Sequence, residues 1–176
     1  MQRILITGGC GFIGRHVASE LLAHNYRVRL LDCLVEQVHG DTTATIPEAA
    51  EFMPGDIRDR ETVARAVQDV DAVIHLAAEV GVGQSMYEIA RYVGSNDLGT
   101  AVLLETLIKQ PVGKIVVASS MSIYGEGLYE TAEGRRVEKA VRRVADLKEG
   151  IWDVASETGN RVKPIPTDEE KAADLA

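Results

Sequence analysis

The chain has 176 residues, of which 45% are hydrophobic and 26% are charged, as in a globular domain, which excludes disorder, collagen and coiled coils. The formal net charge of −8 argues against nucleic acid as a partner. The apolar runs are too short to span a membrane, and the first residues show no signal-peptide pattern. Two cysteines provide neither a disulfide framework nor a metal site, so a reduced, cytoplasmic protein is expected.

Five short apolar runs predict buried strands, at residues 3–7, 27–31, 51–53, 72–76 and 114–118. Segments with apolar residues at helical spacing lie between them, at residues 12–22, 58–69 and 87–110, the last interrupted at Gly94. The irregular residues 33–50 predict a loop. Apolar strands that alternate with amphipathic helices predict an α/β fold, in which helices cover both faces of a parallel sheet in three layers.

The composition changes after Gly125, which predicts a division into residues 1–125 and 126–176. Residues 130–150 carry a narrow apolar stripe that predicts one amphipathic helix, formed by Val137, Ala140, Val141, Val144 and Leu147. Acidic residues interleave with the arginines of this segment, which favours a solvated helix face over a nucleic-acid site. No strand is predicted in residues 151–176, so the second part is expected to be a charged, largely helical extension.

Gly8, Gly11 and Gly14 follow a G-x-x-G-x-x-G spacing between the first predicted strand and the first predicted helix. Glycines permit a sharp turn and bring backbone amides close to a pyrophosphate, and the helix N-terminus attracts the anion. The alternative is a purely structural turn, but the strand-turn-helix context favours a dinucleotide site in a Rossmann-like, doubly wound sheet.

Asp32 follows the second predicted strand, 18 residues after Gly14. A carboxylate at this place binds the adenosine ribose hydroxyls and repels a 2′-phosphate, so NAD is favoured over NADP. The alternative is a surface aspartate in a turn.

Six motifs follow one another over the first 125 residues: TGGCGFIG (7–14), LLDCL (30–34), GDIRD (55–59), HLAA (75–78), NDLGT (96–100) and SSMSIYG (119–125). Together they resemble the extended short-chain dehydrogenase/reductase family, in particular its NAD-dependent nucleotide-sugar epimerase/dehydratase branch. The resemblance implies roles for thirteen residues. Gly8, Gly11, Phe12, Ile13 and Gly14 would line the NAD pyrophosphate, Asp32 the adenosine ribose, and Asp56 and Ile57 the adenine. Leu76, Ala77 and Ala78 would line the groove, Asn96 would tie a helix to the neighbouring strand, and Ser120 would be the catalytic serine.

Several of these residues also have simpler interpretations. Ala77 at a strand end is as readily a small packing residue, Asn96 a helix-surface amide, and Ser120 a cap at the end of a strand. His75 ends a buried strand, so a hydrogen-bonded structural histidine is expected rather than a base. Cys10 and Cys33 flank the proposed site without a positive cluster, so packing residues are expected rather than redox sensors.

The resemblance implies that Ser120 hydrogen-bonds a sugar hydroxyl while a hydride passes to the nicotinamide. Met121 and Ser122 stand where the dehydratases carry an acidic pair, so epimerase or simple oxidoreductase chemistry fits better than dehydration.

The chain departs from the family at its proton-transfer pair, a tyrosine followed four residues later by a lysine. The residues four positions after the five tyrosines are Leu30, Arg91, Asn96, Leu128 and Glu133, and none is lysine. We therefore expect the chain to end before the pair, the sheet to be incomplete on its C-terminal side, and the chain alone to be inactive. The expected function is the NAD-binding portion of a nucleotide-sugar epimerase, with a homodimer implied by the resemblance. The alternatives are a non-catalytic NAD sensor and an interaction module with a Rossmann-like fold.

Overall fold

The computed structural model describes residues 1–40 and 46–174. The chain forms two compact units, Met1–Ala118 and Ser119–Ala176. The division thus falls directly after the fifth strand, whereas the sequence predicted it after residue 125.

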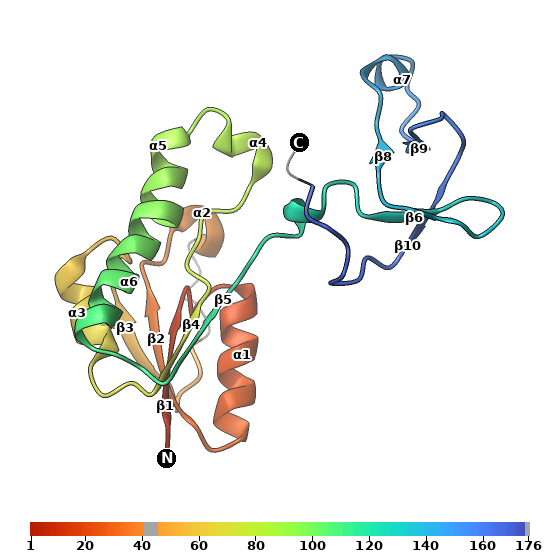
Figure 1. The fold of residues 1–176 in the computed structure, drawn as a ribbon. Helices are drawn as coiled ribbons and strands as arrows, with labels where there is room; N and C mark the ends of the chain where they lie inside the picture. The colour runs from red at the N-terminus through yellow and green to blue at the C-terminus, as the bar shows by residue number, and fades with distance from the viewer. Residues whose placement is uncertain (41–45, 175–176) are drawn as a thin grey trace. The chain divides into compact units, whose positions relative to one another are not determined.

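The first unit is built on a five-stranded parallel sheet with the order β3-β2-β1-β4-β5 (Figure 1). The strands are β1 (Arg3–Thr7), β2 (Arg27–Asp32), β3 (Glu51–Pro54), β4 (Ala72–His75) and β5 (Lys114–Val117). In the register of the sheet, Ile6 lies between Leu30 on β2 and Ile74 on β4. All five predicted strands are confirmed.

Two hydrophobic cores lie on opposite faces of this sheet because successive side chains of a strand point to opposite faces. Helix α1 (Phe12–Ala23) covers one face, where Ala18 packs with Ile6 and Leu30. Helices α3 (Arg60–Val67) and α6 (Gly99–Lys109) cover the other, where Val63 and Leu103 pack with other buried residues. This arrangement confirms the predicted three-layer, Rossmann-like fold. At the sheet edge β5 is exposed, and Ile115, Val116 and Val117 keep 37%, 50% and 52% of their surface accessible.

The helix predicted over residues 87–110 is an α-helix with a π-helical segment inside it. It consists of α5 (Ile89–Tyr92), the π-helix η1 (Val93–Leu98) and α6, so the predicted interruption at Gly94 is a local widening of the helix. Two four-residue helices, α2 (Glu36–His39) and α4 (Val82–Ser85), follow β2 and β4. Helix α2 lies within the predicted loop 33–50, of which residues 41–45 are outside the described part of the chain.

The regular structure of the second unit consists mainly of short antiparallel strands. Strands β6 (Leu128–Glu130), β7 (Arg136–Val137) and β10 (Lys163–Ile165) form a sheet with the order β10-β6-β7. Strands β8 (Ala140–Val141) and β9 (Ala155–Ser156) pair separately. The helical elements are the 3-10 helix η2 (Met121–Tyr124) and α7 (Val144–Lys148).

The prediction of a single helix over residues 130–150 and of a largely helical extension is wrong. The side chain of Thr131 accepts hydrogen bonds from the amides of Glu133 and Arg135, and Gly134 adopts a φ of +76°, so a turn interrupts the segment. The apolar stripe does not pack as one face, because Val144 remains 67% exposed. Strands β9 and β10 also occur where none was predicted, since runs of two or three residues carry too little periodicity to be recognised.

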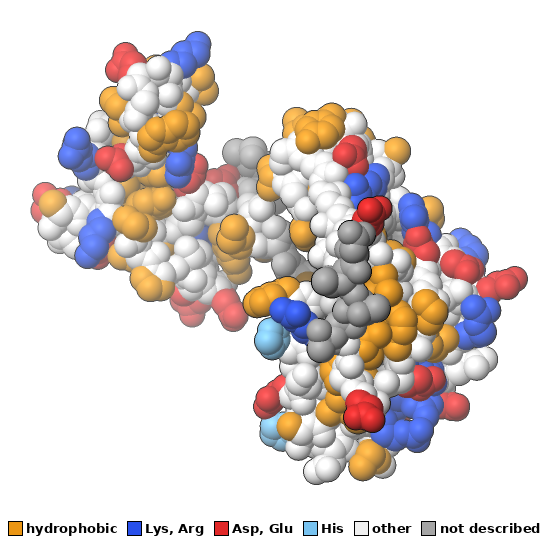
Figure 2. Space-filling view, turned by 180° about the vertical axis from the view of Figure 1, so that it is seen from behind, with side chains coloured by type: hydrophobic (Ala, Val, Ile, Leu, Met, Phe, Trp, Pro, Cys, Tyr) orange, Lys and Arg blue, Asp and Glu red, His pale blue; other side chains and the backbone are white. Residues whose placement is uncertain are grey.

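Acidic and basic side chains are interspersed on the face of the molecule seen in Figure 2. Within residues 1–40 and 46–174, none of the helices has the length and apolar character needed to cross a bilayer.

Candidate functional site

The segments that follow the carboxyl ends of four strands lie next to one another. The amide of Gly8 donates to the carbonyl of Leu31 at 2.8 Å, and the amide of Leu76 donates to the carbonyl of Thr7 at 3.0 Å. The amide of Gly55 donates to the carbonyl of Asp32 at 3.0 Å. These bonds join the segments that follow β1, β2, β3 and β4, which carry most of the site residues predicted from the sequence.

Close packing requires glycine at two of the three G-x-x-G-x-x-G positions in the turn after β1. Gly8 has a φ of +67°, and a Cβ atom there would lie 2.8 Å from the backbone nitrogen of Ala77. A Cβ atom on Gly14 would lie 2.7 Å from the Cα atom of Gly9, so glycine lets α1 pack against the turn. A Cβ atom on Gly11 would meet only the carbonyl oxygen of Gly8, at 3.3 Å. Space is therefore left in front of Gly11.

The N-terminus of α1 is open. Its N-cap residue is Gly11, so no side chain caps the first amides, and the first turn contains no acidic residue. Phe12 and Ile13 are 73% and 61% exposed. Free amides at a positive helix end form an anion site, and the open space at Gly11 fits a pyrophosphate.

Asp32 is 8% exposed and its carboxylate is fixed from both sides. Oδ2 accepts a hydrogen bond from the amide of Cys10 at 2.9 Å, and Oδ1 accepts one from the amide of Leu34 at 2.9 Å. The Nε2 atom of His39 lies 3.7 Å from Oδ1. Oδ2, with the amide of Cys10 as its donor, retains a lone pair for a further donor, such as a ribose hydroxyl.

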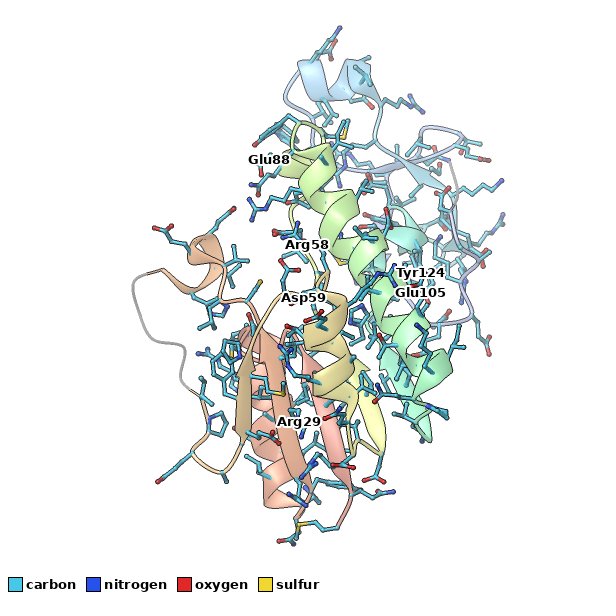
Figure 3. The ribbon with its side chains drawn as sticks, turned by 90° about the vertical axis from the view of Figure 1, so that its left-hand side faces the viewer. Arg29, Arg58, Asp59, Glu88, Glu105 and Tyr124 are labelled. Carbon is cyan, nitrogen blue, oxygen red and sulfur yellow. The ribbon has the colours of Figure 1, made fainter. Side chains whose placement is uncertain are left out.

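Asp56 and Ile57 follow β3. The guanidinium of Arg58 donates to both oxygens of Asp56, at 2.9, 3.1 and 2.6 Å, and holds the pKa of this carboxyl below its ordinary value. Figure 3 shows Arg58 and Asp59 at the N-terminal end of α3. Ile57 is buried, and a Cβ atom on Gly99 would lie 2.5 Å from its Cγ2 atom, so α6 approaches this residue closely.

His75 is held by two threonines. Thr100 donates its hydroxyl to the carbonyl of Asn96, so it accepts from Nε2 of His75 at 3.0 Å. Nδ1 of His75 then accepts from the hydroxyl of Thr7 at 2.6 Å, and that hydroxyl also accepts from the amide of Ala77. Burial lowers the pKa of His75. The two hydrogen bonds confirm the hydrogen-bonded structural histidine expected from the sequence.

Asn96 lies in the π-helix η1 and clamps the backbone of Glu79, which follows β4. Its Oδ1 atom accepts from the amide of Glu79 at 2.8 Å, and its Nδ2 atom donates to the carbonyl at 3.1 Å. Between β4 and Glu79, Leu76 and Ala77 are half-buried and Ala78 is exposed.

Ser120 belongs to the second unit, where its hydroxyl oxygen accepts a hydrogen bond from the amide of Ser122 at 3.1 Å and caps η2. This bond uses one lone pair and leaves the hydroxyl proton available. A role in catalysis remains a prediction for this residue.

Neither cysteine has the properties of a reactive thiol. Burial, together with the nearby Asp32, raises the pKa of Cys10 to about 11. Partial desolvation also raises the pKa of Cys33, and the carboxylates of Asp32 and Asp56 add to the effect. Both thiols therefore stay protonated at neutral pH.

Several residues that connect the segments after the carboxyl ends of the strands were not predicted from the sequence. Thr7 is a polar residue in an apolar strand, which could have been noticed, but its partner His75 lies 68 residues away. His39, Gln37, Gln84 and Arg91 stand in irregular or helical segments without any motif. In the described part of the chain, no three His, Cys, Asp or Glu side chains are arranged to hold a metal ion.

Comparison with known proteins identifies relatives over the whole first unit. Residues 4–141 match the NAD dependent epimerase/dehydratase family. A dTDP-L-rhamnose 4-epimerase from Burkholderia thailandensis is 33% identical over 99% of this chain and 51% of its own length. A UDP-glucose 4-epimerase from Neisseria meningitidis is 39% identical over 72% of this chain and 39% of its own length.

A solved structure agrees with these sequence matches. The UDP-glucose 4-epimerase of Thermus thermophilus, in complex with NAD, is 35% identical with a TM-score of 0.64, over 76% of this chain and 42% of that one. The chain thus spans about half or less of the length of these relatives. The fold, the glycine turn and these matches agree, and the chain belongs to the NAD-dependent epimerase/dehydratase family.

Proposed function

We propose that this chain is the NAD-binding portion of an epimerase that acts on a nucleoside-diphosphate sugar. The observation that carries the proposal is the open N-terminus of α1 beside Gly11, with the fixed carboxylate of Asp32 on the neighbouring strand. This pairing fits a pyrophosphate and an adjacent ribose.

The residues that follow the carboxyl ends of the strands would hold the cofactor as the family resemblance implies. The amides of the turn would bind the pyrophosphate, Asp32 the adenosine ribose, and Asp56 and Ile57 the adenine. Leu76, Ala77 and Ala78 would line the remaining groove, and Asn96 would fix the segment that follows them through Glu79. NAD, when bound, supplies the acceptor for a hydride from a sugar carbon.

The fixed carboxylate of Asp32 favours NAD over NADP. Its two backbone hydrogen bonds prevent it from turning away, so a 2′-phosphate would meet a negative charge with little surrounding water.

Ser120 would hydrogen-bond the sugar hydroxyl during its oxidation. No tyrosine of this chain is followed four residues later by lysine, so its residues lack the base that would take the proton. The chain alone is therefore expected to bind NAD without oxidising the sugar. Met121 and Ser122 bear no acidic group for eliminating water, which supports epimerisation over dehydration.

The relatives suggest the class of sugar. Both curated relatives named above are 4-epimerases, of a dTDP-linked and a UDP-linked sugar. The match to the dTDP-L-rhamnose 4-epimerase continues through the second unit, whereas the match to the UDP-glucose 4-epimerase covers 72% of the chain. This difference favours a dTDP-linked sugar, epimerised at its 4-position.

A homodimer and a cytoplasmic location complete the proposal. Apolar side chains are exposed along α5, η1 and α6, where Ile89, Leu104 and Ile108 are 61%, 46% and 81% exposed. A second copy that packs against this stripe would remove it from water.

Calorimetric titration with NAD tests the binding claim, and addition of dTDP-L-rhamnose tests the expected inactivity. We expect NAD to bind and the sugar to keep its configuration at the 4-position, as followed by NMR, because an active epimerase returns the hydride and accumulates no net NADH. Formation of the 4-epimer would show that a tyrosine-lysine pair is not needed here. A cooperatively folded chain that fails to bind NAD would instead be an interaction module.

A further inference from the structure

A cluster of five polar side chains joins the segment after β2 to the segment after β4. We call it the clasp: Gln37, Glu79, Gln84, Glu88 and Arg91. Arg91 is its centre, because its Nε and Nη2 atoms donate to the two carboxylate oxygens of Glu79 at 2.9 and 2.8 Å. Its Nη1 atom donates to Glu88 at 2.9 Å and to Oε1 of Gln37 at 3.0 Å. Figure 3 labels Glu88, at the α5 end of the cluster.

The side-chain amides of Gln37 and Gln84 pair with each other. Nε2 of Gln37 donates to Oε1 of Gln84 at 3.0 Å, and Nε2 of Gln84 donates to Oε1 of Gln37 at 3.2 Å. Gln84 also donates to Glu88 at 2.8 Å. Because each side-chain amide both donates to and accepts from the other, the pairing defines the relative orientation of the two side chains.

The topology of the sheet places the clasp over the proposed cofactor site. Gln37 lies in α2, which follows β2, while Gln84 lies in α4, which follows β4. Strand β1 lies between these two strands in the sheet, so a direct contact between α2 and α4 crosses the carboxyl end of β1. The glycine turn and the N-terminus of α1 follow β1 at this place.

Apart from the clasp, the anchor of α2 is His39, whose Nε2 atom lies 3.7 Å from Oδ1 of Asp32. Helices α2 and α4 have four residues each, and neither contains a buried residue. Helices of this length are unstable without tertiary contacts. Gly40 after α2 and Gly81 before α4 have φ values of +58° and +144°, so each segment also adjoins a residue with wide conformational freedom.

We propose that the clasp holds the segments after β2 and β4 closed across the bound dinucleotide, with Arg91 as its positioning residue. This inference rests on the proposed function. Release of the cofactor then requires the contact between Gln37 and Gln84 to open, so the clasp acts on the dissociation rate. Arg91 acts through Gln37 and Glu79 and is not expected to touch the dinucleotide.

The test uses NADH as the probe. The chain is loaded with NADH and mixed with excess NAD, and the loss of NADH fluorescence gives the release rate. We expect Arg91→Gln to release NADH about tenfold faster, since it removes the four hydrogen bonds that the guanidinium donates, including the one to Gln37 of α2, with a smaller change in the association rate. Arg91→Lys keeps the charge but loses the planar fork, so it should restore only part of the effect.

Gln84→Ala and Gln37→Ala provide an independent pair of variants. Each substitution alone should accelerate the release of NADH. The double variant should release NADH about as fast as either single variant, because both substitutions remove the same contact. Glu105→Gln is the matched control. It removes an exposed ion pair with Arg60 between α3 and α6, outside the clasp, and should leave the release rate unchanged.

The outcomes separate this inference from the proposed function. A wild-type chain that is folded but binds no NADH would overturn the proposed function. Wild-type binding with unchanged release rates in folded Arg91→Gln would overturn the clasp alone. If Arg91→Gln does not fold, the glutamine variants decide, and unchanged release in Gln84→Ala would overturn the inference.

Discussion

The amide of Cys10 donates a 2.9 Å hydrogen bond to Oδ2 of Asp32, 22 residues further along the chain. This bond joins the turn after β1 to the last residue of β2, so the proposed pyrophosphate and ribose sites share one rigid connection. The partner is a backbone amide, so it survives any substitution of the cysteine except proline. The carboxylate of Asp32 is thus positioned before any cofactor arrives.

Gly11→Ala and Gly14→Ala should separate cofactor binding from folding. Gly11 has φ −67° and ψ 174°, which alanine adopts readily, and its added methyl group would occupy the open space of the cradle. We expect Gly11→Ala to unfold at nearly the wild-type urea midpoint but to bind NAD about tenfold more weakly or worse. Gly14→Ala places a Cβ atom 2.7 Å from Gly9 and should lower the urea midpoint itself. Equal stability of the two variants would contradict this distinction.

Arg29→Met should destabilise the first unit. The buried guanidinium donates from Nη1 to the carbonyls of Ala66 and Gln68, both at 2.7 Å, at the C-terminal end of α3 (Figure 3). Its Nε atom also lies 3.0 Å from Glu51. Methionine retains most of the apolar stem but leaves these carbonyls without a donor, at a cost of about 2–4 kcal/mol.

Urea denaturation of Arg29→Met checks this value, with Arg60→Met as the control. Arg60 forms an exposed ion pair with Glu105, so its loss should lower the urea midpoint far less than the loss of Arg29. Similar losses in both variants would show that burial of Arg29 is not the cause.

The free energy of unfolding should depend on the protonation of His75. Burial lowers the pKa of His75 below the ordinary value of 6.5, so the unfolded chain takes up a proton more readily than the folded chain. The contribution of His75 to stability is therefore complete above pH 6.5 and decreases as the pH falls toward its folded-state pKa. Urea denaturation at several pH values should show a steeper acid loss for the wild type than for His75→Gln. Parallel curves would mean that His75 titrates as freely in the folded state as in the unfolded one.

Cys10 and Cys33 should react slowly with iodoacetamide at neutral pH. Burial and the charge of Asp32 raise the pKa of Cys10 to about 11, and the pKa of the more exposed Cys33 is also raised. Only the thiolate attacks, so both cysteines should be alkylated more slowly than free cysteine, with Cys33 ahead of Cys10. Mass spectrometry of timed samples checks this order. Rapid modification of Cys10 in the folded chain would contradict its burial.

The first unit was predictable because its signals are local and strong. Each strand has an apolar centre, and a turn with the G-x-x-G-x-x-G spacing stands between the first strand and the first helix. The second unit was not predictable in this way. Residues 137–147 have helical spacing, yet Thr131 and Gly134 form a turn, and Ala140 and Val141 pair with β9, about 15 residues away. Tertiary pairing overrides weak periodicity in such short strands.

The site was predictable only where a motif carries it. The glycines and Asp32 stand at recognisable positions, but the clasp joins Gln37 to Gln84 across 47 residues, and no pattern in either segment indicates its partner. Arg29 illustrates the same limit. An arginine within an apolar strand is visible in the sequence, but the carbonyls that it binds belong to a helix more than 35 residues later.

The most direct test of the account is a calorimetric titration of the wild type and of Asp32→Asn with NAD and with NADP. Asparagine keeps the shape of the side chain and removes its charge. The wild type should bind NAD more tightly than NADP by about tenfold or more, and Asp32→Asn should lose this preference. The exposed Asp69→Asn serves as the charge-matched control and should retain it. Equal affinity of the wild type for NAD and NADP, or an unchanged preference in Asp32→Asn, would contradict the assignment of Asp32 as the residue that selects NAD.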